Sequence, residues 1–168
     1  MKTIIGNNLP EITEVTLLSL EEYKECNKNI NLFDLIPDEE VGSWYLQTPA
    51  GDEALWVVIC DEIDKTYYVT IEEDPPFGSG GIGLRPVIKL SSSTLKDGTI
   101  LEVGDNVVIG KITLIAISNT ILFSNKAIWY DKENDTYGYF DDETNIYENS
   151  LAKKRVDAWF EAEIKPNL

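Results

Sequence analysis

The chain of 168 residues contains no histidine, only two cysteines and one methionine. The absence of histidine excludes Ser-His-Asp and Cys-His nucleophilic sites, and it removes the usual zinc ligand. Cys26 and Cys60 are far apart in the chain. Two cysteines allow a single disulfide as one possibility, but they exclude a fold built on several disulfides. No apolar run reaches the roughly 18 residues that a membrane-spanning helix requires, and the N-terminus lacks a signal-peptide pattern. We therefore expect a soluble protein of a reducing cytoplasm.

Basic residues are also scarce. The chain has fourteen Lys and Arg residues and thirty Asp and Glu residues, which gives a net charge of −16 at neutral pH. Phosphate contacts are made by Lys and Arg, so this balance argues against direct nucleic-acid binding and against docking on anionic membranes. Two interpretations stay open: the acidity keeps a small protein soluble, or it steers the protein toward a basic protein surface.

The composition is that of a folded chain, with 43% hydrophobic and 10% aromatic residues. The length fits a single domain over 1–168, or two small lobes over 1–93 and 99–168 divided by the Ser-rich segment 91–98. Between a predicted helix near each end, most of the sequence shows the patterns of short strands. We predict an α+β fold of short, mostly antiparallel strands with a helix near each end. The expected strands are 15–18, 55–60, 67–71, 84–90, 112–117, 120–123, 127–130 and 137–140.

Both expected helices begin at a serine. Ser19-Leu20-Glu21-Glu22 has the form of a capping box, which predicts a helix from Leu20 to about Asn27. The second helix is expected from Asn149 or Ser150 to about Ile164, before Pro166. Val156, Trp159 and Phe160 form its predicted apolar face.

No pattern in the chain predicts an enzyme or a cofactor. The glycine-rich stretch Gly78–Gly83 precedes Leu84-Arg85-Pro86, which cannot readily open the helix that a phosphate-binding loop needs. The abundant acids carry no specificity for paired-carboxylate catalysis. The acids between Asp131 and Asp142 follow the spacing of a calcium loop, but Thr136 occupies the position that requires glycine. We predict a hairpin with an acidic turn there, and no metal site.

These acids support a different hypothesis. Carboxylates held on a rigid scaffold imitate a phosphate backbone and compete for a groove that binds DNA or RNA. The alternative is a solvated acidic surface. The predicted binding residues are Asp131, Glu133, Asp135, Asp141, Asp142 and Glu143, with Glu72, Glu73 and Asp74 as a second patch.

Two motifs carry a family resemblance. The two motifs are Trp44-Tyr45-Leu46-Gln47-Thr48-Pro49 and Gly83-Leu84-Arg85-Pro86-Val87-Ile88-Lys89-Leu90. They resemble a W-W-L-R-S-P…G-V-R-P-A-L-x-L signature of uncharacterised phage and prophage domains. These domains are similar to the C-type-lectin-like fold of formylglycine-generating enzymes and phage receptor-binding proteins. Thr16–Tyr23 and Tyr147–Ser150 also resemble phage versions. Gln47 replaces the usual arginine, and no catalytic residue is carried over. In this signature, Trp44 and Leu46 should point inward, and Arg85 should be bonded beneath a loop.

Together these features predict a small non-enzymatic binding protein, encoded by a phage and present in the host cytoplasm. The expected activity is anti-CRISPR-like: inhibition of a host defence nuclease by occupying its basic nucleic-acid-binding surface. One alternative is a lectin-like recognition module that uses the 74–83 loop with Trp56, Tyr67 and Phe77. Another is a structural phage component.

Overall fold

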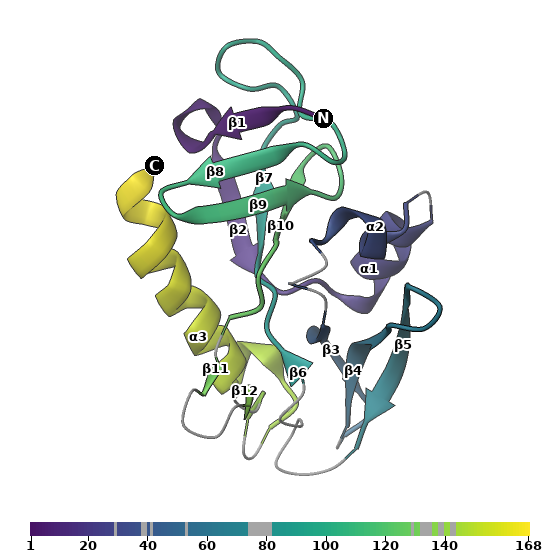
Figure 1. Cartoon of the computed structure of the whole chain (residues 1–168). Coiled ribbons are helices and arrows are strands. Elements are labelled where there is room, and N and C mark those ends of the chain that lie inside the picture. The colour runs from purple at the N-terminus through teal and green to yellow at the C-terminus, as the bar shows by residue number, and fades with distance from the viewer. Residues whose placement is uncertain are drawn as a thin grey trace.

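The computed structural model describes residues 1–28, 30–37, 40, 42–52, 54–73, 82–128, 130–131, 136–137, 140–141 and 144–168. Its larger sheet has six strands in the order β1-β8-β9-β10-β7-β2 (Figure 1). All pairs in it are antiparallel except β1 with β8. Strands from both sides of the 91–98 segment therefore share one sheet. The bounds are β1 Thr3–Ile5, β2 Ile12–Thr16, β7 Val87–Leu90, β8 Asn106–Ile109, β9 Ile112–Ala116 and β10 Ile121–Ser124.

The second sheet has four strands in the order β5-β4-β3-β6. β3 and β6 are parallel, and the other pairs are antiparallel. A separate two-stranded hairpin, β11-β12, confirms the hairpin expected around the acidic turn. The α+β fold of mostly antiparallel strands is thus confirmed. The bounds are β3 Ser43–Ala50, β4 Ala54–Asp61, β5 Thr66–Glu72, β6 Ile82–Gly83, β11 Tyr130–Asp131 and β12 Thr136–Tyr137.

The helices lie near the two ends of the chain, as predicted. α1 (Leu20–Asn27) begins with the expected capping box: Ser19 Oγ accepts the Glu22 N–H at 3.1 Å, and Glu22 accepts the Ser19 N–H at 3.0 Å. A short helix that the sequence did not predict, α2 (Leu32–Leu35), follows α1. The closing helix α3 (Leu151–Trp159) continues through a wider π turn at Phe160–Ile164 and a 3-10 turn at Lys165–Asn167. Shorter 3-10 turns occupy Gly6–Asn8 and Tyr147–Asn149.

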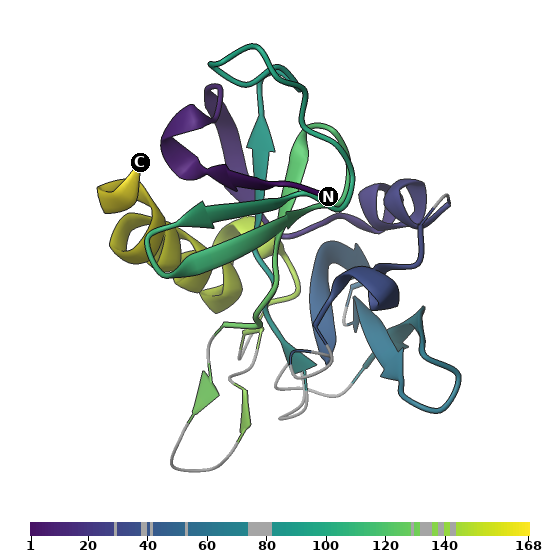
Figure 2. The same ribbon diagram turned by 45° about the horizontal axis from the view of Figure 1, so that its top comes forward.

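The four-stranded sheet is packed on both faces. Leu55 and Val57 of β4 contact a cluster that includes Val156 of α3, whereas Val58 contacts a cluster beneath α1 and α2. This two-sided burial explains why β4 reads as a continuous apolar run. A third cluster joins the six-stranded sheet to Trp159 and Ile164. Figures 1 and 2 show α3 and the β4–β5 hairpin on opposite sides of the molecule.

Several predicted strand boundaries differ from the structure, and two of them show the physical reason. The strand expected over 15–18 is β2, which begins at Ile12 and ends at Thr16, because its pairing with β7 ends where Thr16 faces Val87. The strand expected over 84–90 begins only at Val87. Pro86 lacks an N–H for a strand ladder, and its carbonyl instead accepts the Ser124 N–H at 3.0 Å. Leu84 forms an isolated bridge with Ile128.

Candidate functional site

Strands β4 and β5 with their turn form a regular unit over residues 54–73, which we call the acidic hairpin. Its register is continuous from Leu55 opposite Glu72 to Asp61 opposite Thr66. At the turn, Asp61 Oδ1 accepts the N–H groups of Ile63 and Asp64, both at 3.0 Å. Lys65 completes the turn in the left-handed region, at φ 53°. The side-chain acceptor and the left-handed residue fix a tight turn.

The acidic hairpin carries five acids and one lysine. Glu62, Asp64 and Glu73 are exposed, and Asp61 and Glu72 are partly buried. None of the five lies in an ion pair with a lysine or arginine that the structure describes. Several acids elsewhere are neutralised locally. Examples are Asp105 with Lys2 at 2.8 Å, Glu22 with Lys89 at 2.7 Å and Asp157 with Lys153 at 2.6 Å.

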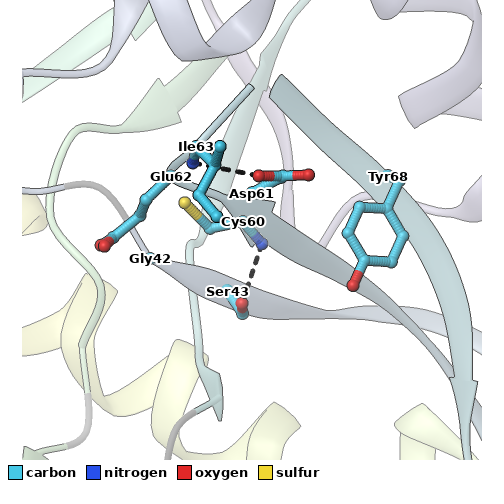
Figure 3. A pocket seen from close by; sticks show the side chains of 7 residues that line it. All are labelled: Gly42, Ser43, Cys60, Asp61, Glu62, Ile63 and Tyr68. Carbon is cyan, nitrogen blue, oxygen red and sulfur yellow. Dashed lines mark hydrogen bonds between the residues drawn. The ribbon is translucent and has the colours of Figure 1, made fainter. Parts of the chain in front are cut away.

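A wide depression of about 570 Å³ lies beside the turn of the acidic hairpin. Figure 3 shows Ser43 of β3 close to Cys60 of β4, with Glu62 and Tyr68 on opposite sides of this pair. Ser43 Oγ accepts the Cys60 N–H at 3.0 Å, which ties β4 to β3 at this point. Gly42, Asp61 and Ile63 complete the lining.

The chemistry of Cys60 does not favour catalysis in this depression. Burial raises the pKa of the Cys60 thiol, and the nearby carboxylates of Glu62 and Asp61 raise it further. Nucleophilic cysteines need the opposite surroundings, because only the thiolate attacks. The depression therefore presents carboxylates, a tyrosine and a protonated thiol to solvent, and it is better suited to binding than to nucleophilic chemistry.

Among the predicted binding residues, Asp141 has an internal role. It is 8% exposed. Its Oδ2 accepts the Thr144 N–H at 2.9 Å, and its Oδ1 accepts the Leu151 N–H at 3.0 Å. The carboxylate thus holds the chain at the start of α3, where an anion is favourable because of the helix dipole.

The described members of the two predicted acidic patches lie on separate elements. Glu72 ends β5 and Glu73 follows it, whereas Asp131 lies in β11. In both Figure 1 and Figure 2, β6 lies between the β11-β12 hairpin and β5. The remaining predicted residues, Glu133, Asp135, Asp142, Glu143 and Asp74, lie outside the described residues.

Of the aromatic residues expected for a lectin-like site, Tyr67 and Trp56 both pack into the cluster beneath α1 and α2. Tyr67 is only 7% exposed, and its ring packs edge-on against Trp44 with centroids 4.7 Å apart. Trp56 is partly buried, and Phe77 lies outside the described residues. Tyr68, which the sequence did not single out, is 50% exposed. Only the alternation of side chains along β5 distinguishes it from Tyr67.

The signature residues have structural roles, as predicted. Trp44 and Leu46 are buried, and so is Tyr45 between them. Arg85 is 1% exposed and donates to the backbone carbonyls of Asn125 at 2.8 Å, Ser124 at 3.4 Å and Glu40. Its guanidinium also lies over the Trp44 ring, 5.4 Å from the centroid.

No group of three or more His, Cys, Asp or Glu side chains is placed to hold a metal ion within the described ranges. No helix of the described chain is long and apolar enough to cross a membrane. Comparison with known proteins gives no match to a family model, to a curated sequence or to a solved structure. The resemblance to phage domains therefore stays a prediction.

Proposed function

We propose that this protein is a non-enzymatic binding protein that uses the acidic hairpin to occupy a basic surface of a nucleic-acid-binding protein. One observation carries the proposal. The carboxylates at both ends of the hairpin are not neutralised by any lysine or arginine that the structure describes, whereas several acids elsewhere are. An ordered hairpin that presents such carboxylates is complementary to a basic groove.

In its specific form, the proposal is a phage-encoded, anti-CRISPR-like inhibitor of a host defence nuclease in the host cytoplasm. Carboxylates on a rigid strand pair compete with phosphates because both interact with Lys and Arg through the same Coulomb attraction. The net charge of −16 adds long-range steering toward a basic partner. The phage context comes from the resemblance of the two motifs.

A salt-dependent capture experiment tests the proposal. The tagged protein is incubated with lysate of a phage-susceptible bacterium at about 50 and 500 mM NaCl, where the Debye lengths differ by roughly threefold. Bound proteins are identified by mass spectrometry. We expect recovery of a nucleic-acid enzyme at low salt only, and inhibition of its cleavage activity by the purified protein. Recovery of virion proteins or glycans alone would contradict the proposal.

A matched pair of variants separates the site from net charge. The hairpin variant carries Glu62→Lys, Asp64→Lys and Glu73→Lys, and the control carries Glu11→Lys, Glu161→Lys and Glu163→Lys. All six acids are exposed, and both variants change the net charge equally. We expect the hairpin variant to lose at least tenfold in inhibition and the control to lose much less. Equal losses would mean that total charge, and not the hairpin, is responsible.

A further inference from the structure

The outer edge of β5 is open. β5 is the last strand of the four-stranded sheet, and among the described residues no strand pairs with its other side. Among the hydrogen bonds of the described residues, one reaches the start of this edge, where Asn31 Nδ2 donates to the Lys65 carbonyl at 3.3 Å. An open edge presents unpaired backbone donors and acceptors, to which another strand can add.

The hydrogen bond at Cys60 shows which groups point outward. The Cys60 N–H points toward β3, because it donates to Ser43 Oγ at 3.0 Å. Cys60 therefore does not use its backbone groups toward β5, and the pair that it forms with Tyr67 is a non-hydrogen-bonded pair. Backbone direction alternates along a strand. The N–H and C=O groups of Tyr67, Val69 and Ile71 thus point away from β4, and those of Tyr68 and Thr70 point toward it.

A groove of about 480 Å³ runs along this edge, between β5 and α1. β5 contributes Tyr67, Tyr68 and Val69 to its lining. Side chains of consecutive strand residues point to opposite faces, so a groove bordered by three in a row includes the backbone of the strand. The opposite wall is one side of α1, formed by Tyr23, Lys24, Asn27 and Lys28.

The α1 wall also holds polar atoms without a partner. The Tyr23 side chain is 3% exposed, and neither its hydroxyl nor Asn27 Oδ1 has a hydrogen-bond partner in the structure. Burial raises the pKa of Tyr23 to about 12, so the hydroxyl keeps its proton. Buried polar atoms are nearly always satisfied in complete assemblies. These two atoms are themselves buried, so the hydrogen-bonding groups that a partner can reach are those of the β5 edge.

We propose that a partner segment adds to β5 as a further strand, seated between β5 and α1. The segment is an extended peptide with Lys or Arg at its two ends and uncharged residues in the middle. Its ends face the carboxylates of Glu62 and Asp64 at one end of the acidic hairpin and of Glu72 and Glu73 at the other. Its middle is uncharged because the exposed Lys24 and Lys28 border the groove there. The inference rests on the proposed function and names the part of the basic partner that is bound.

A second copy of this chain fits the edge less well. Antiparallel pairing of two β5 strands would place the Glu62 and Asp64 end of one copy beside the Glu72 and Glu73 end of the other. Like charges held opposite each other are destabilising, and each chain carries a net charge of −16. A basic segment removes this repulsion.

Binding of a designed peptide tests the recognition. The probe is a fluorescein-labelled peptide, Lys-Arg-Thr-Val-Thr-Val-Thr-Arg-Lys, measured by fluorescence anisotropy at low salt. The control peptide replaces both valines with proline, which keeps the charge and removes backbone donors. We expect the valine peptide to bind at least tenfold more tightly. Equal binding of the two peptides, or no binding of the valine peptide, would overturn strand addition, whereas the capture experiment with lysate tests the proposed function separately.

Amide hydrogen exchange gives a second test without any variant. On addition of the valine peptide, we expect the N–H groups of Tyr67, Val69 and Ile71 to become protected, while those of Tyr68 and Thr70 are protected from the start. Uniform protection, or none, would overturn the proposal.

In a matched pair of variants, Ile71→Pro removes one outward donor and Ile71→Val keeps it. Only Ile71→Pro should weaken peptide binding, by at least fivefold, and unchanged binding by a folded Ile71→Pro protein would contradict it.

Discussion

At the scale of single residues, Arg85 connects three parts of the chain. It donates to the carbonyls of Ser124 at the end of β10 and of Asn125 directly after it, and to the Glu40 carbonyl near the start of β3. Its guanidinium also lies over the rings of Trp44 and Phe123, at 5.4 and 5.8 Å. A planar group with five donors can serve several carbonyls while stacking flat on aromatic faces, whereas an ammonium group has three donors and no plane to stack. Arg85 therefore fixes the position of both sheets relative to each other.

This geometry predicts that Arg85→Lys lowers the free energy of unfolding by about 2–4 kcal/mol, since a lysine leaves buried carbonyls unsatisfied. Urea unfolding followed by far-UV circular dichroism measures the change. Lys111→Ala is the control, because Lys111 is exposed and has no ion pair among the described residues. That variant should change stability by less than about 0.5 kcal/mol. A similar small change for Arg85→Lys would show that Arg85 is not a structural link.

At the scale of elements, the start of α3 depends on Ser150, which directly precedes the helix, and on Asp141, which lies farther back in the chain. Ser150 Oγ accepts the Lys153 N–H at 3.1 Å, as an N-cap residue does. Asp141 accepts the N–H of Leu151, the first residue of the helix, from ten positions earlier in the chain. Phe140 packs beside it against Tyr45, with ring centroids 5.6 Å apart. α3 is thus anchored to the four-stranded sheet at its N-terminus.

We predict that Asp141→Asn lowers the free energy of unfolding by about 1.5–3 kcal/mol, because an amide nitrogen replaces one charged acceptor and faces an N–H group. Thermal and urea unfolding measure this change. The same variant should leave binding to a basic partner unaffected once the protein is folded. Loss of binding without loss of stability would instead place Asp141 in the contact surface, as the sequence hypothesis had it.

At the scale of the whole molecule, charge is distributed unevenly between paired and unpaired acids. The ion pairs Lys2–Asp105, Lys89–Glu22 and Lys153–Asp157 neutralise acids around the six-stranded sheet, α1 and α3. The acidic hairpin has no such pairing among the described residues. A net charge of −16 on one small protein also produces self-repulsion in the folded state.

Self-repulsion predicts that added salt stabilises the protein. Between about 20 and 300 mM NaCl, screening shortens the Debye length severalfold, and the melting temperature should rise. Scanning calorimetry measures the shift. The control variant with Glu11→Lys, Glu161→Lys and Glu163→Lys has a smaller net charge and should show a smaller rise. A melting temperature that falls with salt would mean that the ion pairs outweigh the repulsion.

Local signals in the sequence were sufficient to predict several elements of the structure. The capping box placed α1 correctly because Ser19 and Glu22 satisfy each other's backbone donors within one turn. The apolar run of β4 and the following alternation in β5 predicted a hairpin, which is confirmed. α2 was missed because four residues are too few to show a helical period. The role of Asp141 was missed because its partners are set by packing and not by spacing.

The sequence by itself determined the fold class, the helix near each end and the excess of acid, because these depend on local pattern and composition. It also predicted that Arg85 is bonded beneath a loop. Only the tertiary structure decided which acids are neutralised, since a lysine such as Lys89 reaches Glu22 across elements far apart in the chain. It likewise decided that β5 is an outer strand, that its edge borders α1, and that Tyr68, not Tyr67, faces solvent. Strand order and edge exposure arise from long-range pairing, for which neighbouring residues carry no signal.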